Sequence, residues 1–345
     1  MNILNPWKPS WAEKISVNKL GFDIVKEMLK DYEKLNIEVT ELKNKTTVID
    51  CGVNASGGYK AGELAAKIRL GGLGEIKITC VTYEDFSMPT AVTYTDFPAM
   101  IGLCTYVWFG IVPQPFDTKA EFSAWISGPG RVLAQEPKKV FEKINYKDKS
   151  DISVLVVQSR KLPDEKIANY LAEKCKVDPK NLYLVVTPTE SLAGSLQVVA
   201  VSALEDTFWR LTEFYGIPYD RIKYAMSSCI IPPISPKIFQ EPCITPDDAI
   251  RYSGIVHYWL ESSEGDDLEA IVKGMTIENY PKQFGKSYYQ IGGHPQELQD
   301  LHSFAKEGKG FVVGEAAISD IRTGRMYKAG KVHIEMIKMM LKNPW

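Results

Sequence analysis

The sequence predicts an α/β fold, because apolar strand-like runs alternate with segments of helical periodicity. Residues 46–53, 151–159 and 181–186 are short apolar runs rich in branched side chains, as is typical of buried strands. Residues 163–175 have the apolar spacing of a helix between two of these runs. The chain has 345 residues, 45% of them hydrophobic, so we expect two domains or one large α/β unit.

The first part of the chain is predicted to be an extension followed by a helix and several strands. Residues 1–15 are rich in Trp and Pro, and residues 16–36 place Leu20, Ile24 and Met28 on one side of a helix. The elements expected next are strands at 37–42 and 46–53, a helix at 61–70, a turn and strand over 71–81, a strand at 89–95, a buried helix or strand at 97–112, and a helix that opens at 127–131 and runs to about 144.

A charge-rich break at 147–151 separates this part from the rest. We therefore expect an N-terminal extension at 1–15, a first α/β lobe at 16–150 and a second at 151–345. The elements expected in the second lobe are a strand at 151–159, helices at 163–175 and 187–211 on either side of a strand at 181–186, the segment 222–228, a proline-rich turn at 231–236, a short helix at 246–250, a strand at 254–262, a helix starting near 264, and a hairpin at 314–330.

Composition excludes several classes of function. There are 41 basic and 43 acidic residues, so no broad positive field is available for nucleic acid. No window approaches the roughly 18 apolar residues of a membrane span, and the N-terminus lacks the apolar core of a signal peptide. We therefore expect a cytoplasmic protein. The six cysteines include no CxxC pair and the four histidines no HxxxH or HxH, so neither a disulfide framework nor a metal site is expected.

The helix predicted at 187–211 places one carboxylate on a row of hydroxyls. Ser191, Ser195, Ser202 and Glu205 are separated by four, seven and three residues, which stacks them on one face. The other faces are apolar. Two interpretations are open: the row lines a pocket, or it faces bulk water as in most amphipathic helices.

Two glycine-rich turns resemble anion-binding loops. Asn54, Ser56, Gly57 and Gly58 lie between a strand and a helix and offer backbone N–H groups, although a plain tight turn would have the same composition.

The second turn contains Ser127, Gly128 and Arg131 at a predicted helix start, where Arg131 opposes the helix dipole unless an anion is bound. Asp50 and Asp96 each end a strand, and carboxylates at strand ends often bind ligands, but Asp50 would equally cap a turn. No GxSxG motif or paired Ser–His supports nucleophilic catalysis.

Taken together, these strings resemble the methenyltetrahydromethanopterin cyclohydrolase family. The similar strings follow the order of that family from about Ser16 to about Met340: VIDCGVNASGGYKAG, GGLG, TDFPA, SGPGR, LYLVVTPTESLAGSLQV, IPPISP and DIRTGRMYKAG. The resemblance implies reversible hydrolysis of N5,N10-methenyltetrahydromethanopterin to N5-formyltetrahydromethanopterin. It also implies a cytoplasmic homotrimer of two-lobed mixed α/β subunits, with a pterin pocket between the lobes and neither a metal nor an organic cofactor.

The resemblance assigns roles to individual residues. A glutamate on the long helix would orient the attacking water and accept its proton, and Glu205 matches it if one residue is allowed to slip. Ser202 would help to orient the water. The proposed pterin contacts are Asn54, Ser56, Gly57, Gly58, Asp96, Ser127, Gly128, Arg131, Thr189, Ser191 and Ser195.

The chain departs from the family pattern at two places. The family has Arg three residues before the glutamate, whereas without a slip Val201 and Leu204 occupy these two positions. The family's Asp-His-Pro turn is Asp96-Phe97-Pro98 here. Two hypotheses follow: a working cyclohydrolase with a rearranged acid/base site, or a paralogue that keeps the fold and binds a pterin, or acts on a related ligand, without cyclohydrolase activity.

Overall fold

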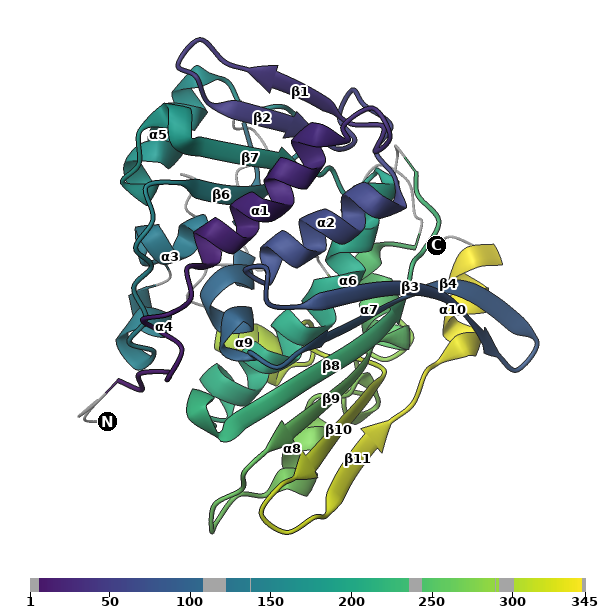
Figure 1. The fold of residues 1–345 in the computed structure, drawn as a ribbon. Helices are drawn as coiled ribbons and strands as arrows, with labels where there is room; N and C mark the ends of the chain where they lie inside the picture. The colour runs from purple at the N-terminus through teal and green to yellow at the C-terminus, as the bar shows by residue number, and fades with distance from the viewer. Residues whose placement is uncertain are drawn as a thin grey trace. The chain divides into compact units, whose positions relative to one another are not determined.

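The computed structural model describes residues 6–107, 122–136, 138–235, 244–288, 290–291 and 301–342. It contains two mixed sheets with helices packed on them, which confirms the predicted α/β class (Figure 1). The chain forms two compact units: unit 1 is Met1–Gly74 with Met100–Gln197, and unit 2 is Glu75–Ala99 with Val198–Trp345. The boundary expected at residue 150 falls inside unit 1, and the chain changes units at three other points.

Unit 1 is built on a five-stranded sheet in the order β1-β2-β7-β6-β5. The three central strands pair in parallel, and the two edge strands pair antiparallel. The central strands are buried on both faces, which explains their continuous apolar sequences. The strand bounds are β1 (Glu38–Glu41), β2 (Thr47–Asp50), β5 (Trp125–Ser127), β6 (Ser153–Gln158) and β7 (Leu182–Val186).

Helices cover both faces of this sheet. Helices α1 (Val17–Lys30) and α2 (Tyr59–Arg69) pack on one face, where Met28, Leu64 and Val185 belong to one core cluster (Figure 1). Helix α5 (Glu165–Cys175) packs on the other face, where Leu171 belongs to a cluster with Leu155 and Leu184. Unit 1 is therefore a three-layer α/β/α structure.

One expected helix in unit 1 is interrupted. The segment predicted to run from 127–131 to about 144 forms α3 (Gly130–Ala134) and α4 (Lys138–Lys143). Gln135 ends α3 in the left-handed conformation, with φ of 59°, and Glu136 precedes a proline, which disfavours a helical residue there. The segment expected at 97–112 contains a π-helical turn, Ile101–Thr105, and its last five residues lie outside the described ranges.

Unit 2 is built on a six-stranded sheet in the order β11-β10-β9-β8-β4-β3. Only β9 and β10 pair in parallel. The hairpin predicted at 314–330 is formed by β10 and β11. The strand bounds are β3 (Glu75–Tyr83), β4 (Phe86–Thr95), β8 (Ile222–Ile230), β9 (Ile255–Leu260), β10 (Glu315–Asp320) and β11 (Met326–Gly330).

Helices cover one face of the second sheet. Helix α6 (Leu192–Trp209) begins in unit 1 and ends in unit 2, where Thr93 Oγ1 donates to the carbonyl of Ala200 at 2.6 Å. Tyr258 of β9 reaches the same helix, with its hydroxyl 3.1 Å from the carbonyl oxygen of Leu204. The other helices of unit 2 are α7 (Pro246–Ser253), α8 (Leu268–Gly274), α9 (Leu301–Lys306) and α10 (Ile334–Lys342).

The described part of the N-terminal extension is attached to unit 1. Trp7 forms an isolated parallel bridge with Ile144, and the ring of Trp11 meets that of Tyr146 edge-on at 5.2 Å. Among the described residues, no helix has the length and apolar character needed to cross a bilayer.

Candidate active site

Glu205 lies on α6 with its side chain buried. Its exposed fraction is 1%, and Ser202 Oγ, one turn earlier, donates to Glu205 Oε2 at 3.2 Å. Ser195 on the same helix is equally buried, and Ser202 is half-buried. The predicted row of polar side chains is therefore not a solvated face, and the bulk-water interpretation is wrong for this helix.

The two serines near the start of α6 differ in their roles. Ser191 Oγ accepts the N–H of Gly194 at 3.0 Å and donates to the carbonyl of Pro188 at 2.9 Å. This is the geometry of a helix N-cap, so the Ser191 hydroxyl is used by its own helix. Ser195 Oγ is buried and has no hydrogen-bond partner within the described ranges. Of these two hydroxyl groups, that of Ser195 is the one available to form a hydrogen bond with a ligand.

A second carboxyl group, on Asp247, interacts with Glu205. Asp247 lies in the first turn of α7, after the N-cap Thr245. Burial, the charge of Asp248 and the charge of Glu205 together raise the pKa of Asp247 to about 7. A carboxyl with such a pKa is half protonated at neutral pH, so it serves as an acid or as a base without a large energetic cost.

Asp248 holds the start of α7 in place. Its Oδ2 accepts the N–H of Thr245 at 3.0 Å and the hydroxyl of Thr245 at 2.8 Å, and its Oδ1 accepts the N–H of Tyr288 at 2.6 Å. Burial raises the pKa of Asp248, and these hydrogen bonds act in the opposite direction. Since both oxygens of Asp248 accept backbone N–H groups, Asp248 fixes the start of α7, on which Asp247 lies.

Tyr288 completes the surroundings of these carboxyls. Burial, the charge of Asp247 and the charge of Asp206 raise the pKa of the Tyr288 phenol well above its usual range. The phenol therefore stays protonated at neutral pH. We use the name acidic cluster for Glu205, Asp206, Asp247 and Asp248, all of which lie in unit 2.

The first glycine-rich turn is organised by Asp50. Its carboxylate accepts four consecutive backbone N–H groups, at 2.9 Å from Gly52, 2.6 Å from Val53, 2.7 Å from Asn54 and 3.2 Å from Ala55. These are the N–H groups that an external anion would need. The plain-turn alternative accounts for this part of the loop, because the protein supplies its own anion.

The remaining residues of this turn have local explanations as well. Gly57 has φ of 63°, and a Cβ there would lie 2.3 Å from the carbonyl oxygen of Cys51, so only glycine fits. Its N–H donates to the carbonyl of Asn36 at 2.8 Å. Gly58 precedes the first residue of α2, and the side chains of Asn54 and Ser56 are exposed. Asn54 and Ser56 therefore present exposed side chains at this turn.

The second glycine-rich turn buries its polar side chains. Arg131 is fully buried and its Nη1 donates to the carbonyl of Ile126 at 2.8 Å. Ser127 is buried too, and the N–H of Gly128, at φ of 103°, donates to the carbonyl of Cys104 at 2.7 Å. The hydrogen bond to Ile126 ties α3 to β5, so Arg131 has a structural role that the sequence did not reveal.

The last two predicted contacts differ in burial. Thr189 is buried and its Oγ1 accepts a hydrogen bond from Gln158 Nε2 at 2.8 Å. Gln197 Nε2 lies 3.5 Å from Gln158 Oε1, and Arg69 Nη1 donates to Gln197 Oε1 at 2.7 Å. Asp96, in contrast, is exposed at the end of β4.

The predicted site residues belong to both units. Unit 2 holds Glu205, Ser202 and Asp96, and the other predicted contacts lie in unit 1. Sequence reasoning missed Asp247, Asp248 and Tyr288. Two adjacent acids after a Thr-Pro helix start were a visible signal of a capped helix, but not of proximity to Glu205.

The described ranges contain no group of three or more His, Cys, Asp or Glu side chains arranged to hold a metal ion. The described cysteines are free thiols, and burial raises the pKa of Cys175 to about 11 and that of Cys229 to about 12. Thiols of this kind are poor nucleophiles at neutral pH. Cys243 and His294 lie outside the described residues.

Comparison with known proteins places the chain in a family. The family described as "Cyclohydrolase (MCH)" matches residues 16–340. Methenyltetrahydromethanopterin cyclohydrolase of Methanocaldococcus jannaschii is 36% identical over 331 residues, which is 95% of this chain and 98% of the relative. The proteins of the same name from Methanothermobacter marburgensis and Methanothermobacter thermautotrophicus are 35% and 34% identical, each over 94% of this chain and 98% of the relative. The chain therefore belongs to the methenyltetrahydromethanopterin cyclohydrolase family.

Proposed function

We propose that this protein catalyses the reversible hydrolysis of N5,N10-methenyltetrahydromethanopterin to N5-formyltetrahydromethanopterin. The observation that carries the proposal is the near full-length match to relatives named for this activity. Both sheets and the acidic cluster lie within the matched residues, so the whole scaffold is present.

The reaction needs one group to take a proton and one to give a proton. The methenyl carbon is part of an amidinium-like cation and is already electrophilic. Water loses a proton as its oxygen bonds to this carbon, and a ring nitrogen gains a proton as its bond to the carbon breaks. The hydroxyl of this adduct then loses its remaining proton as the formyl C=O forms, and the deprotonated acid can take it, so the overall hydrolysis releases one proton to solvent. A base beside the carbon and an acid beside the nitrogen can carry these transfers.

Glu205 and Asp247 supply these two roles in our proposal. Glu205 accepts the proton of the attacking water, with the hydroxyl of Ser202 orienting that water or the carboxylate. Asp247 in its protonated form donates to the leaving nitrogen, since its pKa is raised to about 7. Charge repulsion between the two carboxylates favours the state in which one of them holds a proton.

This pair replaces the Arg–Glu pair that the family resemblance implies. Val201 and Leu204, which occupy those two positions without a slip, are both fully buried. A guanidinium would hold the glutamate ionised, whereas a second carboxyl stores a proton beside it. In this proposal the base lies on α6 and the acid is supplied by α7.

The second candidate function is that of a pterin-binding paralogue without hydrolysis. Val201 and Leu204 favour it, because a chain that keeps apolar residues at both positions has lost both groups of the family pattern. In that case Glu205 and Asp247 act on no substrate, and the buried hydroxyl of Ser195 serves binding only.

An absorbance assay distinguishes the two functions. The purified protein is expected to make the methenyl absorbance of the tetrahydromethanopterin substrate decay, with the tetrahydrofolate analogue run alongside. Glu205→Gln is expected to slow the decay by about 100-fold or more, because it removes the base. The control is Glu269→Gln in the same unit, whose side chain is 66% exposed and which should leave the rate unchanged.

Three results would count against this assignment. Absence of decay together with tight binding of the substrate leaves the paralogue. Decay with an unaltered rate in Glu205→Gln removes Glu205 from the mechanism but retains the activity. Equal losses in Glu205→Gln and Glu269→Gln point to a general effect of charge on unit 2.

We further propose a homotrimer in the cytoplasm. In the second sheet Tyr94, Tyr224 and Met226 are each exposed by 39–50%, and Tyr94 pairs with Met226 across neighbouring strands. An exposed aromatic surface of this kind favours association of subunits. The exposed free thiol of Cys80 suits a reducing compartment. Light scattering of the purified protein measures the subunit number, and a monomeric mass would contradict the trimer.

A further inference from the structure

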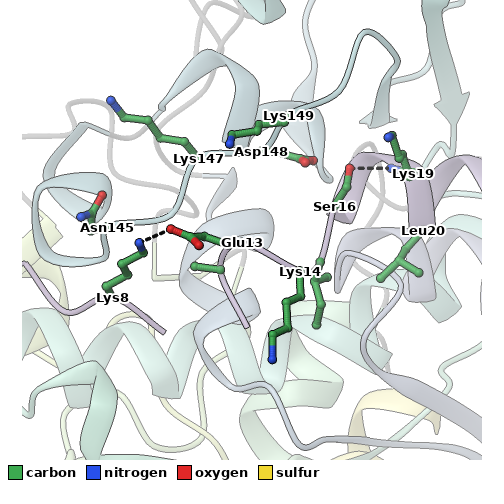
Figure 2. Close-up of a pocket in the computed structure, with 12 residues that line it drawn as sticks. Lys8, Glu13, Lys14, Ser16, Lys19, Leu20, Asn145, Lys147, Asp148 and Lys149 are labelled. Atoms are coloured by element: carbon green, nitrogen blue, oxygen red, sulfur yellow. Dashed lines mark hydrogen bonds and ion pairs between the residues drawn. The ribbon is translucent and has the colours of Figure 1, made fainter. Parts of the chain in front are cut away.

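A lysine-rich pocket lies in unit 1. None of its lining residues belongs to the acidic cluster. Its volume is about 560 Å³, within the range of small-molecule sites (Figure 2). It is formed by two segments, one leading into α1 and one following α4. The lining residues are Lys8, Ala12, Glu13, Lys14, Ile15, Ser16, Lys19, Leu20, Asn145, Lys147, Asp148 and Lys149.

The two segments are fixed to each other beneath the lysines. The hydroxyl of Tyr146 donates to the carbonyl of Ile15 at 2.8 Å, and Asp148 Oδ2 accepts from Asn18 Nδ2 at 2.8 Å and from the N–H of Asn18 at 2.9 Å. Tyr146 is buried while Lys147 and Lys149 on either side of Asp148 are exposed. This alternation, typical of extended backbone, turns both lysines away from the anchoring contacts.

The pocket concentrates positive charge in a chain that has a net charge of −2. Five of its lining residues are lysines and two are acidic, a difference of +3. Lys8 is paired with Glu13, and the Asp148 carboxylate is engaged by Asn18. Lys14, Lys19, Lys147 and Lys149 form no ion pair with any part of the chain that the structure describes.

We propose that this pocket binds a small polyanion that carries two or more linked phosphate groups. In Figure 2 Lys147 and Lys149 lie on one side of the pocket, with Lys8 and Lys14 on the opposite side. Linked phosphates spread their negative charge over a longer span than a single phosphate does, so they can contact lysines on both sides. Such a ligand also relieves the repulsion between the unpaired ammonium groups, which is strongest in a concave site with low-dielectric walls.

The ligand chemistry has two sources, an inorganic polyphosphate and the triphosphate of a nucleotide. Lysine ammonium groups recognise phosphate as point charges and do not distinguish the two. The proposal is independent of the cyclohydrolase assignment, because it uses none of the residues given a role in that reaction.

Calorimetric titration with inorganic tripolyphosphate and with ATP, each without divalent cations, tests the proposal. We expect saturable binding of tripolyphosphate that weakens as salt is added, because salt screens the lysines. Lys147→Gln/Lys149→Gln should weaken it by about tenfold or more. The matched control, Lys43→Gln/Lys166→Gln, removes two exposed lysines from the same unit and should bind as the parent protein does.

Each outcome of this titration is decisive. Binding of both probes with the expected loss identifies the triphosphate group as the recognised feature, and binding of tripolyphosphate alone identifies the inorganic ligand. No saturable binding of tripolyphosphate overturns the proposal. Equal losses in both double variants also overturn it, because they assign the binding to overall charge. Circular dichroism spectra confirm that both variants are folded before they are compared.

Discussion

Asp50 in unit 1 and Asp247 in unit 2 are both carboxylates next to a helix or turn start, but their surroundings are opposite. Asp50 is 2% exposed and accepts four backbone N–H groups at 2.6–3.2 Å. Asp247 faces burial and two like charges, which raise its pKa to about 7. The Asp50 carboxylate accepts the hydrogen bonds that stabilise a loop, whereas the Asp247 carboxyl holds a proton that it can exchange.

The comparison shows that the position of an acid in a motif does not establish its function. Asp50 precedes a turn that resembled an anion-binding loop, yet its carboxylate occupies the N–H groups of that turn. Asp247 belongs to a short capped helix with no recognised motif, yet it lies within electrostatic reach of Glu205. What separates the two is the number of donors around each carboxylate.

The largest expected effect is the loss of stability when the Asp50 carboxylate is removed. Asp50→Ala leaves four N–H groups without an acceptor and should lower the free energy of unfolding by about 2–4 kcal/mol. Chemical denaturation measures this loss. Asp151→Ala, an exposed residue of the same unit, is the control and should stay within about 0.5 kcal/mol of the parent. An Asp50 variant as stable as its control would mean that water replaces the carboxylate without cost.

The next largest effect is the loss of catalytic rate when Asp247 can no longer donate a proton. Asp247→Asn should lower the rate of hydrolysis by about 10- to 100-fold, because an amide cannot donate the proton. The parent enzyme should lose activity as pH rises above about 7, where Asp247 ionises. The variant should lack this decrease.

The pH profile of Asp247→Asn is compared with that of Asp220→Asn, an exposed residue of unit 2. If both variants keep the decrease of the parent, the titrating group is another residue. If the profile changes only in Asp247→Asn, the acid role is assigned to Asp247 and a merely structural role is excluded.

The smallest effect is the pH dependence of stability. The folded pKa of Asp247 lies above its unfolded value, so the folded state holds the proton more tightly. Its contribution is therefore favourable below the unfolded pKa and is lost as pH rises to about 7. Asp247→Asn removes this loss, and its Tm relative to the parent should be higher at about pH 8 than at about pH 5 by about 1–3 °C. Calorimetry at both values measures the difference, and a constant difference would contradict the raised pKa.

The elements that were predicted well are those with a strong local signal. Strands β2, β6 and β7 are continuous apolar runs because both of their faces are buried, so their sequences alone identify them. The helix expected from 127–131 to 144 was interrupted at Gln135, and Pro137 in the sequence was the overlooked signal. The short edge strand β5 has too few residues for any periodicity to emerge.

The site was less predictable because it depends on contacts between distant segments. Periodicity placed Ser202 and Glu205 on one face of a helix, but it could not tell a buried face from a solvated one. The partners of Asp50 and Arg131 are backbone groups, which every residue carries, so no side-chain pattern announces them. The proximity of Asp247 to Glu205 is set by the packing of α7, which is a property of the folded unit.

The hairpin of β3 and β4 has a consequence for synthesis on the ribosome. Its partner strand β8 pairs with β4 from Thr90↔Ile230 onward, and the chain completes most of unit 1 between the two. The β4 edge of the hairpin therefore stays unpaired after it leaves the exit tunnel and until β8 is synthesised. The sheet of unit 1 can form in that interval. Neither unit is obtained by cutting the gene at a single position, and the β4 edge stays open to non-native strand pairing until β8 is synthesised.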